Sequence, residues 1–152
     1  MKPTPKGWPR IASAVWYEDA PKAIDWLCRA FGFEVRLVCE GEGGRIEHSE
    51  LVFGEGLIMV NGTRGDDRPG HERMASPRAN GGVNTQVLCV CVDDADAHCA
   101  RARDAGAHIF REPAEDDHGP EYPLDRTYGA RDPEGHLWFF MQRVRDAPMP
   151  RA

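Results

Sequence analysis

Residues 18–35 read EDAPKAIDWLCRAFGFEV, and this stretch decides the fold. Asp19 is placed to cap the start of a helix, and Pro21 lies in its first turn, where proline is tolerated. Apolar side chains then recur at helical spacing until Gly32, a residue type that commonly ends helices. Residues 11–17, IASAVWY, form a short apolar run and predict a buried strand before the helix.

Three more strands follow this helix in the first half of the chain. Residues 33–39 alternate between apolar and polar side chains. Residues 46–53 and 57–61 are joined by Gly54-Glu55-Gly56, which is a hairpin signature. The sequence therefore predicts one βαβββ module over residues 10–62.

The second half of the chain repeats this order. A strand is predicted over residues 85–92, and residues 92–113 read VDDADAHCARARDAGAHIFREP. In this stretch Asp93-Asp94 starts a helix that Gly106 ends. Asp93 lies 74 residues after Asp19 (93 − 19), and Gly106 lies 74 residues after Gly32 (106 − 32). Two boundaries with the same offset indicate an internal duplication.

The second module is predicted over residues 83–143. Its remaining strands are expected at residues 108–112, 126–131 and 137–142, and residues 113–124 are expected to form a long loop.

The two modules are separated by residues 63–82, a polar stretch rich in glycine and proline that reads as a linker, and residues 144–152 form a tail. Each four-stranded sheet would carry its helix on one face and leave the other face bare. We therefore predict a single α+β domain over residues 1–152, in which two βαβββ modules pack around a shared concave cavity.

Charge and hydropathy argue against a protein that binds nucleic acids or membranes. The chain has 152 residues with 19 Lys and Arg against 25 Asp and Glu, a net charge of −6, and the acidic residues are scattered. Proteins that bind nucleic acids or anionic membranes usually carry a concentrated basic face, so neither is expected as a partner. No run approaches the roughly 20 apolar residues of a membrane span, and the N-terminus lacks the apolar core of a signal peptide. A cytoplasmic protein is expected.

The five cysteines form neither a CxxC motif nor a zinc-finger spacing with histidine, so reduced thiols are expected. Cys89 and Cys91 lie on one face of a predicted strand and could hold a soft metal ion. The alternative is two ordinary thiols, because two sulfurs alone leave a tetrahedral site half built.

Three segments carry a resemblance to a known family: residues 18–35, residues 92–113, and residues 125–140, which read DRTYGARDPEGHLWFF. They resemble the vicinal-oxygen-chelate superfamily, the glyoxalase/bleomycin-resistance/dioxygenase family, and in particular its PhnB-like branch. The resemblance implies the two-module fold and a homodimer. Members of the family include glyoxalases, epimerases, ring-cleaving dioxygenases, thiol transferases that act on antibiotics, and proteins that sequester drugs.

The resemblance also implies where a divalent metal ion would bind. The family takes His, Glu or Gln ligands from the first and last strand of each module. The corresponding positions in this chain are Ala12 or Ser13, Met59, Val87 and Phe139. If the alignment is shifted by one residue, Gln86 is the only possible metal ligand that reaches one of these positions. Apolar side chains cannot coordinate such a cation, and a thioether suits only soft metals. We therefore predict no metal and no other cofactor.

His48 and Glu50 are the candidate catalytic residues. They lie two apart on a predicted strand and so share a face. They could form an acid–base pair, help to bind a ligand, or hold a relocated metal ion together with His118. The alternative is a solvated strand edge without a specific role.

Two further features could serve a ligand. The loop over residues 113–124 could cover a cavity or be an ordinary surface loop. Arg126 could clamp a carboxylate or phosphate, or pair with Asp125 or Asp132. The residues expected to bind a ligand are Trp16, His48, Glu50, Met59, His118, Tyr122, Arg126, Tyr128 and Phe139.

The predicted function is metal-independent binding of an apolar or aromatic small molecule, which the protein would sequester in the cavity between the modules. One alternative is a metal-dependent lyase, isomerase or dioxygenase-like enzyme acting on a small oxygenated metabolite, with a divalent ion as cofactor. The other is a non-catalytic interaction module.

Overall fold

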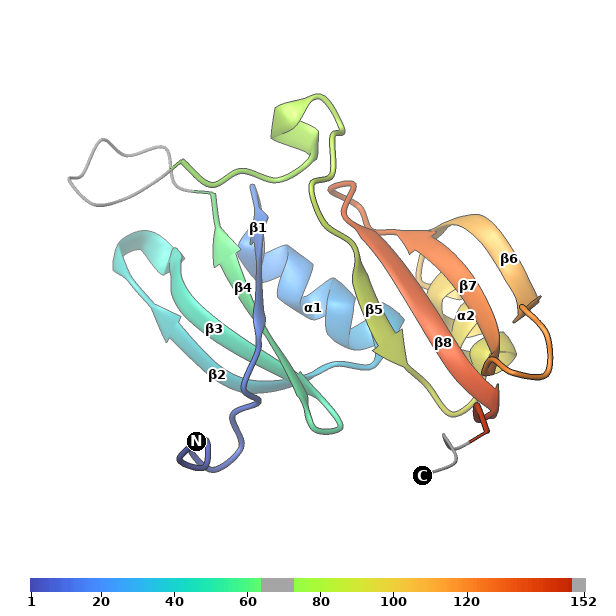
Figure 1. Cartoon of the computed structure of the whole chain (residues 1–152). Helices are drawn as coiled ribbons and strands as arrows, with labels where there is room; N and C mark the ends of the chain where they lie inside the picture. Colours follow the sequence, from blue (N-terminus) through green and yellow to red (C-terminus); the bar gives the residue numbers. More distant parts are fainter. Residues whose placement is uncertain (64–72, 149–152) are drawn as a thin grey trace. The chain divides into compact units, whose positions relative to one another are not determined.

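A computed structural model describes residues 1–63 and 73–148 of the chain. The chain divides into two compact units, Met1–Val83 and Asn84–Ala152, and Figure 1 shows each with its own sheet and helix. Residues 64–72 of the predicted linker lie outside the described residues, and its later part contains a short 3-10 helix, Arg78–Asn80. The shared cavity expected from the sequence stays a prediction.

Unit 1 is a four-stranded sheet with one α-helix. Its elements are β1 (Ser13–Tyr17), α1 (Ala20–Phe31), β2 (Glu34–Glu40), a 3-10 turn (Glu42–Gly44), β3 (Ile46–Phe53) and β4 (Gly56–Gly62). The strand order is β1-β4-β3-β2, with β1 parallel to β4 and the other pairs antiparallel.

Helix α1 begins and ends where the sequence predicts. The Asp19 carboxylate accepts a hydrogen bond from the backbone N–H of Lys22 at 3.2 Å, which satisfies one unpaired donor of the first turn. Gly32 closes the helix with a φ of 80°, a left-handed conformation that glycine adopts at low cost. Leu27 and Phe31 of the helix are fully buried, as are Val60 and Leu51 of the sheet, so the helix covers one sheet face.

Unit 2 repeats this arrangement. Its elements are β5 (Leu88–Cys91), α2 (Ala95–Asp104), β6 (His108–Asp117), β7 (Leu124–Arg131) and β8 (Leu137–Arg145), in the strand order β5-β8-β7-β6. The first and last strands of the unit again run parallel. The predicted α+β class and the two βαβββ modules are confirmed. Neither α1 nor α2, the two α-helices of the described residues, is long and apolar enough to cross a membrane.

Helix α2 covers one face of the second sheet through polar and aromatic contacts. The His98 ring lies with its centroid 4.4 Å from that of Phe140, and its Nδ1 is hydrogen-bonded to the Tyr128 hydroxyl at 2.6 Å. Tyr128 and Phe140 stack at 4.9 Å, and both are fully buried together with Trp138. These side chains form the core of unit 2.

The N-cap of α2 is Asp94, the second of the two aspartates at which the helix was predicted to start, whereas Asp93 had been matched with Asp19. The Asp94 carboxylate accepts a hydrogen bond from the backbone N–H of Ala97 at 2.9 Å. The two helices therefore start 75 residues apart, at Ala20 and Ala95 (95 − 20), while the glycines that follow them remain 74 apart. Neighbouring aspartates are both good caps, and only the backbone conformation selects one of them.

The predicted loop over residues 113–124 is largely strand. Strand β6 continues to Asp117, which pairs with Leu124, and only residues 118–123 connect β6 to β7. The ladder passes over Glu112 and Pro113, of which the proline has no N–H to donate, and it resumes at Ala114. Strand β8 likewise extends beyond its predicted end at residue 142 to Arg145, the partner of Leu124.

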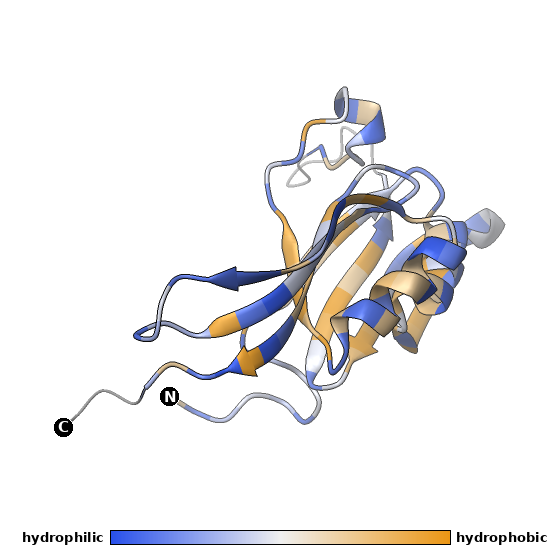
Figure 2. Cartoon of the chain, turned by 90° about the vertical axis from the view of Figure 1, so that its right-hand side faces the viewer, coloured by the Kyte–Doolittle hydropathy of each residue, from blue (hydrophilic) through white to orange (hydrophobic). Residues whose placement is uncertain are grey.

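Charged side chains explain why this hairpin was predicted as a loop. Asp116 accepts hydrogen bonds from Arg111 at 2.5 Å and from the Thr127 hydroxyl at 2.7 Å, and both hold the pKa of Asp116 below its usual value. Figure 2 shows the end of the β6–β7 hairpin as mainly hydrophilic. Cross-strand polar contacts replace the apolar alternation by which strands are identified in a sequence.

The cap assignment is testable by comparing two neighbouring substitutions. Asp94→Ala should lower the free energy of unfolding by about 1 kcal/mol, because it removes the hydrogen bond to Ala97. Asp93→Ala removes the same charge without a cap and should change it by less than about 0.5 kcal/mol. Urea denaturation measures both, and an equal loss in the two variants would contradict the assignment.

Candidate functional site

The strand register divides the side chains of unit 1 between two faces. Leu51 pairs with Ile58, and both are buried on the side of α1. Because side chains alternate along a strand, Met59 points to the opposite face. This second face, called the helix-free face of unit 1, carries Ala14, Trp16, His48, Glu50, Met59 and Asn61.

Glu50 is the most deeply buried charged group on this face. The residue is 6% exposed, and each of its carboxylate oxygens has a partner. Oε1 lies 3.1 Å from Nε2 of His48, and Oε2 lies 3.1 Å from Nη1 of Arg36. A buried carboxylate is costly without such partners, and Arg36 balances its charge. The expected pairing of His48 with Glu50 on one face is therefore present.

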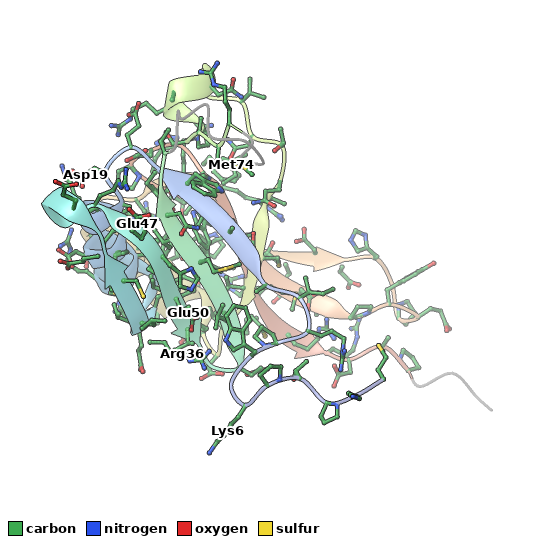
Figure 3. The ribbon with its side chains drawn as sticks, turned by 90° about the vertical axis from the view of Figure 1, so that its left-hand side faces the viewer. Lys6, Asp19, Arg36, Glu47, Glu50 and Met74 are labelled. Atoms are coloured by element: carbon green, nitrogen blue, oxygen red, sulfur yellow. The ribbon has the colours of Figure 1, made fainter. Side chains whose placement is uncertain are left out.

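Arg36 also ties the N-terminal segment to the sheet. Its Nη1 donates to the carbonyl of Gly7 at 2.9 Å, and its Nη2 donates to the carbonyl of Lys6 at 3.5 Å. Figure 3 shows Arg36 beside Glu50, with Lys6 on the N-terminal segment. Arg36 was not among the residues predicted from the sequence. It lies at the irregularity in the β2–β3 register between Val35 and Leu37, next to the pair of Leu37 with Glu50, and the sequence alone does not reveal which strands pair.

Ser49 fixes the position of the strand that carries His48 and Glu50. Its side chain is fully buried on the opposite side of the strand. The Ser49 hydroxyl donates to the carbonyl of Val60 and accepts from the N–H of Val60, the latter at 3.2 Å. This reciprocal pair joins β3 to β4, so the backbone between His48 and Glu50 is held against the neighbouring strand.

Unit 2 has a helix-free face of its own, with aromatic and sulfur-containing side chains. Cys89 pairs with Phe139 and Cys91 pairs with Met141, and alternation places all four opposite the buried Phe140. Phe139 and Met141 are half-buried, and both cysteines are exposed. These four side chains make this part of the face apolar, and the ion pair of Asp125 with Arg143 lies farther along the same face.

Phe110 completes this face. Its ring centroid lies 5.5 Å from that of Phe139, edge to face at 87°. A Cβ at Gly129 would lie 2.5 Å from the Phe110 ring, so the ring lies over the glycine backbone. Phe110 was missed in the sequence, although a glycine inside a strand is itself a signal of close approach by another group.

Tyr128 and Arg126 lie on the other face of the second sheet. Tyr128 is fully buried beneath α2, and burial raises the pKa of its hydroxyl well above the usual value. Arg126 binds both carboxylate oxygens of Asp96 in α2, at 2.6 and 2.7 Å. The register pairs Tyr128 with Phe140 and Gly129 with Phe139, which separates Tyr128 and Arg126 from Phe139. This placement counts against a ligand-binding role for either residue.

Arg126 pairs with an acid, which was one of the two expected alternatives, but that acid is Asp96 and not Asp125 or Asp132. Asp125 instead accepts a hydrogen bond from Arg143 at 2.5 Å. Asp132 is 4% exposed and accepts from the Trp138 indole at 3.1 Å and from the backbone N–H groups of Glu134 and His136 at 3.0 Å each. Asp132 thereby shapes the turn before β8.

His118 and Tyr122 belong to the short connection between β6 and β7. Both are exposed, with Tyr122 at 57%. They lie in unit 2, whereas His48 and Glu50 lie in unit 1. The connection over residues 118–123 is shorter than the loop predicted over residues 113–124. The structure therefore does not support a long loop that closes over a site.

The residues at the family's metal positions do not fit a divalent metal ion. Ser13 pairs with Ile58 and so points toward α1, which leaves Ala12, just before β1, as the matching position. Its counterpart, Val87, precedes β5, and Met59 and Phe139 occupy the last strands. Within residues 1–63 and 73–148, no three His, Cys, Asp or Glu side chains gather as a metal site requires. Both carboxylate oxygens of Glu50 already have protein partners, His48 and Arg36.

One known protein family matches most of the chain. The model of the Glyoxalase/Bleomycin resistance protein/Dioxygenase superfamily matches residues 10–140. The uncharacterized protein Mb0911c of Mycobacterium bovis is 29% identical over 144 residues, covering 93% of this chain and 88% of that protein.

Two solved structures extend the comparison to three dimensions. TioX from Micromonospora sp. ML1 is 32% identical, with a TM-score of 0.68. The match covers 90% of this chain and 100% of TioX. TnmS3, described as an antibiotic binding protein from Streptomyces sp. CB03234, is 20% identical, with a TM-score of 0.60 over 88% of this chain and 93% of TnmS3. At that identity TnmS3 shows the fold alone.

Two glutamates of strand β3 give a matched test of the buried ion pair. Glu50→Gln should lower the free energy of unfolding by about 1–3 kcal/mol, because it leaves Arg36 without its buried counter-charge. Glu47 also pairs with an arginine, Arg45, but its side chain is 35% exposed. Glu47→Gln should therefore cost less than about 1 kcal/mol. Equal costs in urea denaturation would show that burial of Glu50 has no energetic consequence.

Proposed function

Because the chain belongs to the glyoxalase/bleomycin resistance protein/dioxygenase superfamily, we propose that it sequesters an apolar or aromatic small molecule without a metal ion. The observation that carries this proposal is the residue set at the family's metal positions, where Met59 and Phe139 lie on helix-free sheet faces. These side chains offer contact surface instead of metal ligands.

The helix-free faces suit a ligand with rings. Trp16 and Met59 of unit 1 are half-buried, and so is Phe139 of unit 2, beside the 39%-exposed Phe110. Aromatic rings bind other rings edge to face or stacked, and methionine adapts to irregular shapes. Their remaining exposed surface is what a ligand would cover.

A polar anchor accompanies the apolar surface in unit 1. Within the trio of Arg36, His48 and Glu50, the His48 side chain is 37% exposed while that of Glu50 is 8% exposed. We expect a ligand to contact the trio through His48, whose ring is held in place by Glu50. Few, well-fixed polar groups in an apolar surrounding are typical of small-molecule sites.

The description of TnmS3 as an antibiotic binding protein supports the same class of function. It is an example of antibiotic binding by a protein of this fold, and ring-bearing antibiotics are the first compounds to screen. Fold alone does not transfer a ligand from one protein to another.

One observation favours an enzyme as the second candidate. His48 and Glu50 are in hydrogen-bond contact at 3.1 Å, a geometry that also serves acid–base chemistry in a lyase or isomerase. The engagement of both Glu50 oxygens favours binding over a metal-dependent version of this reaction. A screened ligand that is chemically converted on incubation would establish the enzyme.

The binding proposal is tested by thermal melts against a library of aromatic natural products, with chelator present throughout. A ligand should raise the Tm and quench tryptophan fluorescence. For that ligand, Phe139→Ala should weaken binding about tenfold, because burial of part of a phenylalanine ring contributes about 1–2 kcal/mol.

The control is Val144→Ala, which removes an exposed apolar side chain from the same strand and should leave the Kd unchanged. Equal effects of the two substitutions would contradict the proposed contact surface. Binding that requires Ni²⁺, Zn²⁺, Mn²⁺ or Fe²⁺ and disappears in His48→Ala would establish the metal-dependent alternative.

A further inference from the structure

Three sulfur-containing side chains lie on the helix-free face of unit 2 at neighbouring positions of two paired strands. Cys89 and Cys91 lie on the edge strand β5, and Val90 between them points to the buried Phe140 on the other face. Met141 of β8 is the cross-strand partner of Cys91. Both cysteines are exposed, so an ion in solution can reach them.

We propose that Cys89, Cys91 and Met141 bind a soft monovalent metal ion, with Cu(I) as the occupant. This site does not depend on the proposed function, and it differs from the family's metal positions in both residues and ligand chemistry.

The spacing of the two cysteines favours a shared ion over a disulfide. Residues two apart on a strand are separated by about 6.6 Å, whereas the Cβ atoms of a disulfide lie about 3.8 Å apart. Oxidation therefore cannot join Cys89 to Cys91 without breaking the strand. An ion that holds each sulfur at about 2.3 Å spans up to about 4.6 Å, which side chains leaning toward each other can satisfy.

The ligand set selects the metal ion. Thiolate and thioether ligands favour Cu(I), while carboxylate and carbonyl oxygens suit magnesium and calcium. Zinc in a structural site takes four ligands, and two cysteines provide only half of them. Methionine adds a third ligand that is useful to a soft ion and poor for a borderline one.

The charges around Cys89 fit the binding of a cation. Burial raises the pKa of the Cys89 thiol, and the neighbouring Cys91 and then Asp125 raise it further. Negative groups that disfavour a thiolate also favour a positive ion beside it.

The reduced, chelator-treated protein can be titrated with Cu(I) against a chromogenic Cu(I) chelator in the absence of oxygen. Wild type should retain one equivalent. Cys89→Ser and Cys91→Ser should each weaken binding at least tenfold, and Met141→Leu should weaken it less. The matched control is Cys39→Ser, which changes an exposed cysteine of unit 1 and should have no effect.

A second measurement uses the wild-type protein alone. Bound Cu(I), or Ag(I) as a redox-inert substitute, should protect Cys89 and Cys91 from alkylation and leave Cys39 reactive, as mass spectrometry of the peptides would show. Retention of the ion by the Cys89→Ser/Cys91→Ser double variant, or equal protection of Cys39, would overturn the proposal.

Discussion

Each four-stranded sheet in this protein has one helix and therefore one covered face, and the strand register decides which side chains remain on the other. In unit 1 the pairing of Leu51 with Ile58 places Met59 on the helix-free face. In unit 2 the pairing of Gly129 with Phe139 places Phe139 there and buries Phe140 beneath α2. A slip of one residue would exchange the two faces completely. The site, the core and the absence of metal ligands at the family's positions all depend on this register.

Glu50 gives the helix-free face of unit 1 its polar character. Its burial requires counter-charge, which Arg36 supplies, and the same arginine binds the carbonyl groups of the N-terminal segment. The carboxylate therefore stabilises local structure while it orients His48. A carboxylate with both oxygens occupied is suited to fixing a hydrogen-bonding group for a ligand and poorly suited to coordinating an ion. Binding by contact surface and a positioned imidazole is the consistent interpretation.

The sequence was sufficient for features that follow from local signals. Asp19 and Gly32 bound α1 as predicted, and the duplication predicted both units. It was insufficient where the answer depends on pairing. The polar end of β6 was predicted as a loop because its strand is held by contacts such as Asp116 with Thr127. Tyr128 and Phe139 were assigned to one site, although the register places them on opposite faces. Arg36 and Phe110 contribute beside register shifts, which single-sequence periodicity does not reveal.

The central claim is that the helix-free faces bind a small molecule without a metal ion. The most direct measurement is NMR chemical-shift mapping of the isotope-labelled protein, titrated in chelator with the best compound from the screen. The account predicts that the largest amide shifts fall on β4 around Met59 and on β8 around Phe139, with small shifts in α1 and α2. Shifts confined to the helices, or binding that appears only when a divalent metal ion is added, would contradict it.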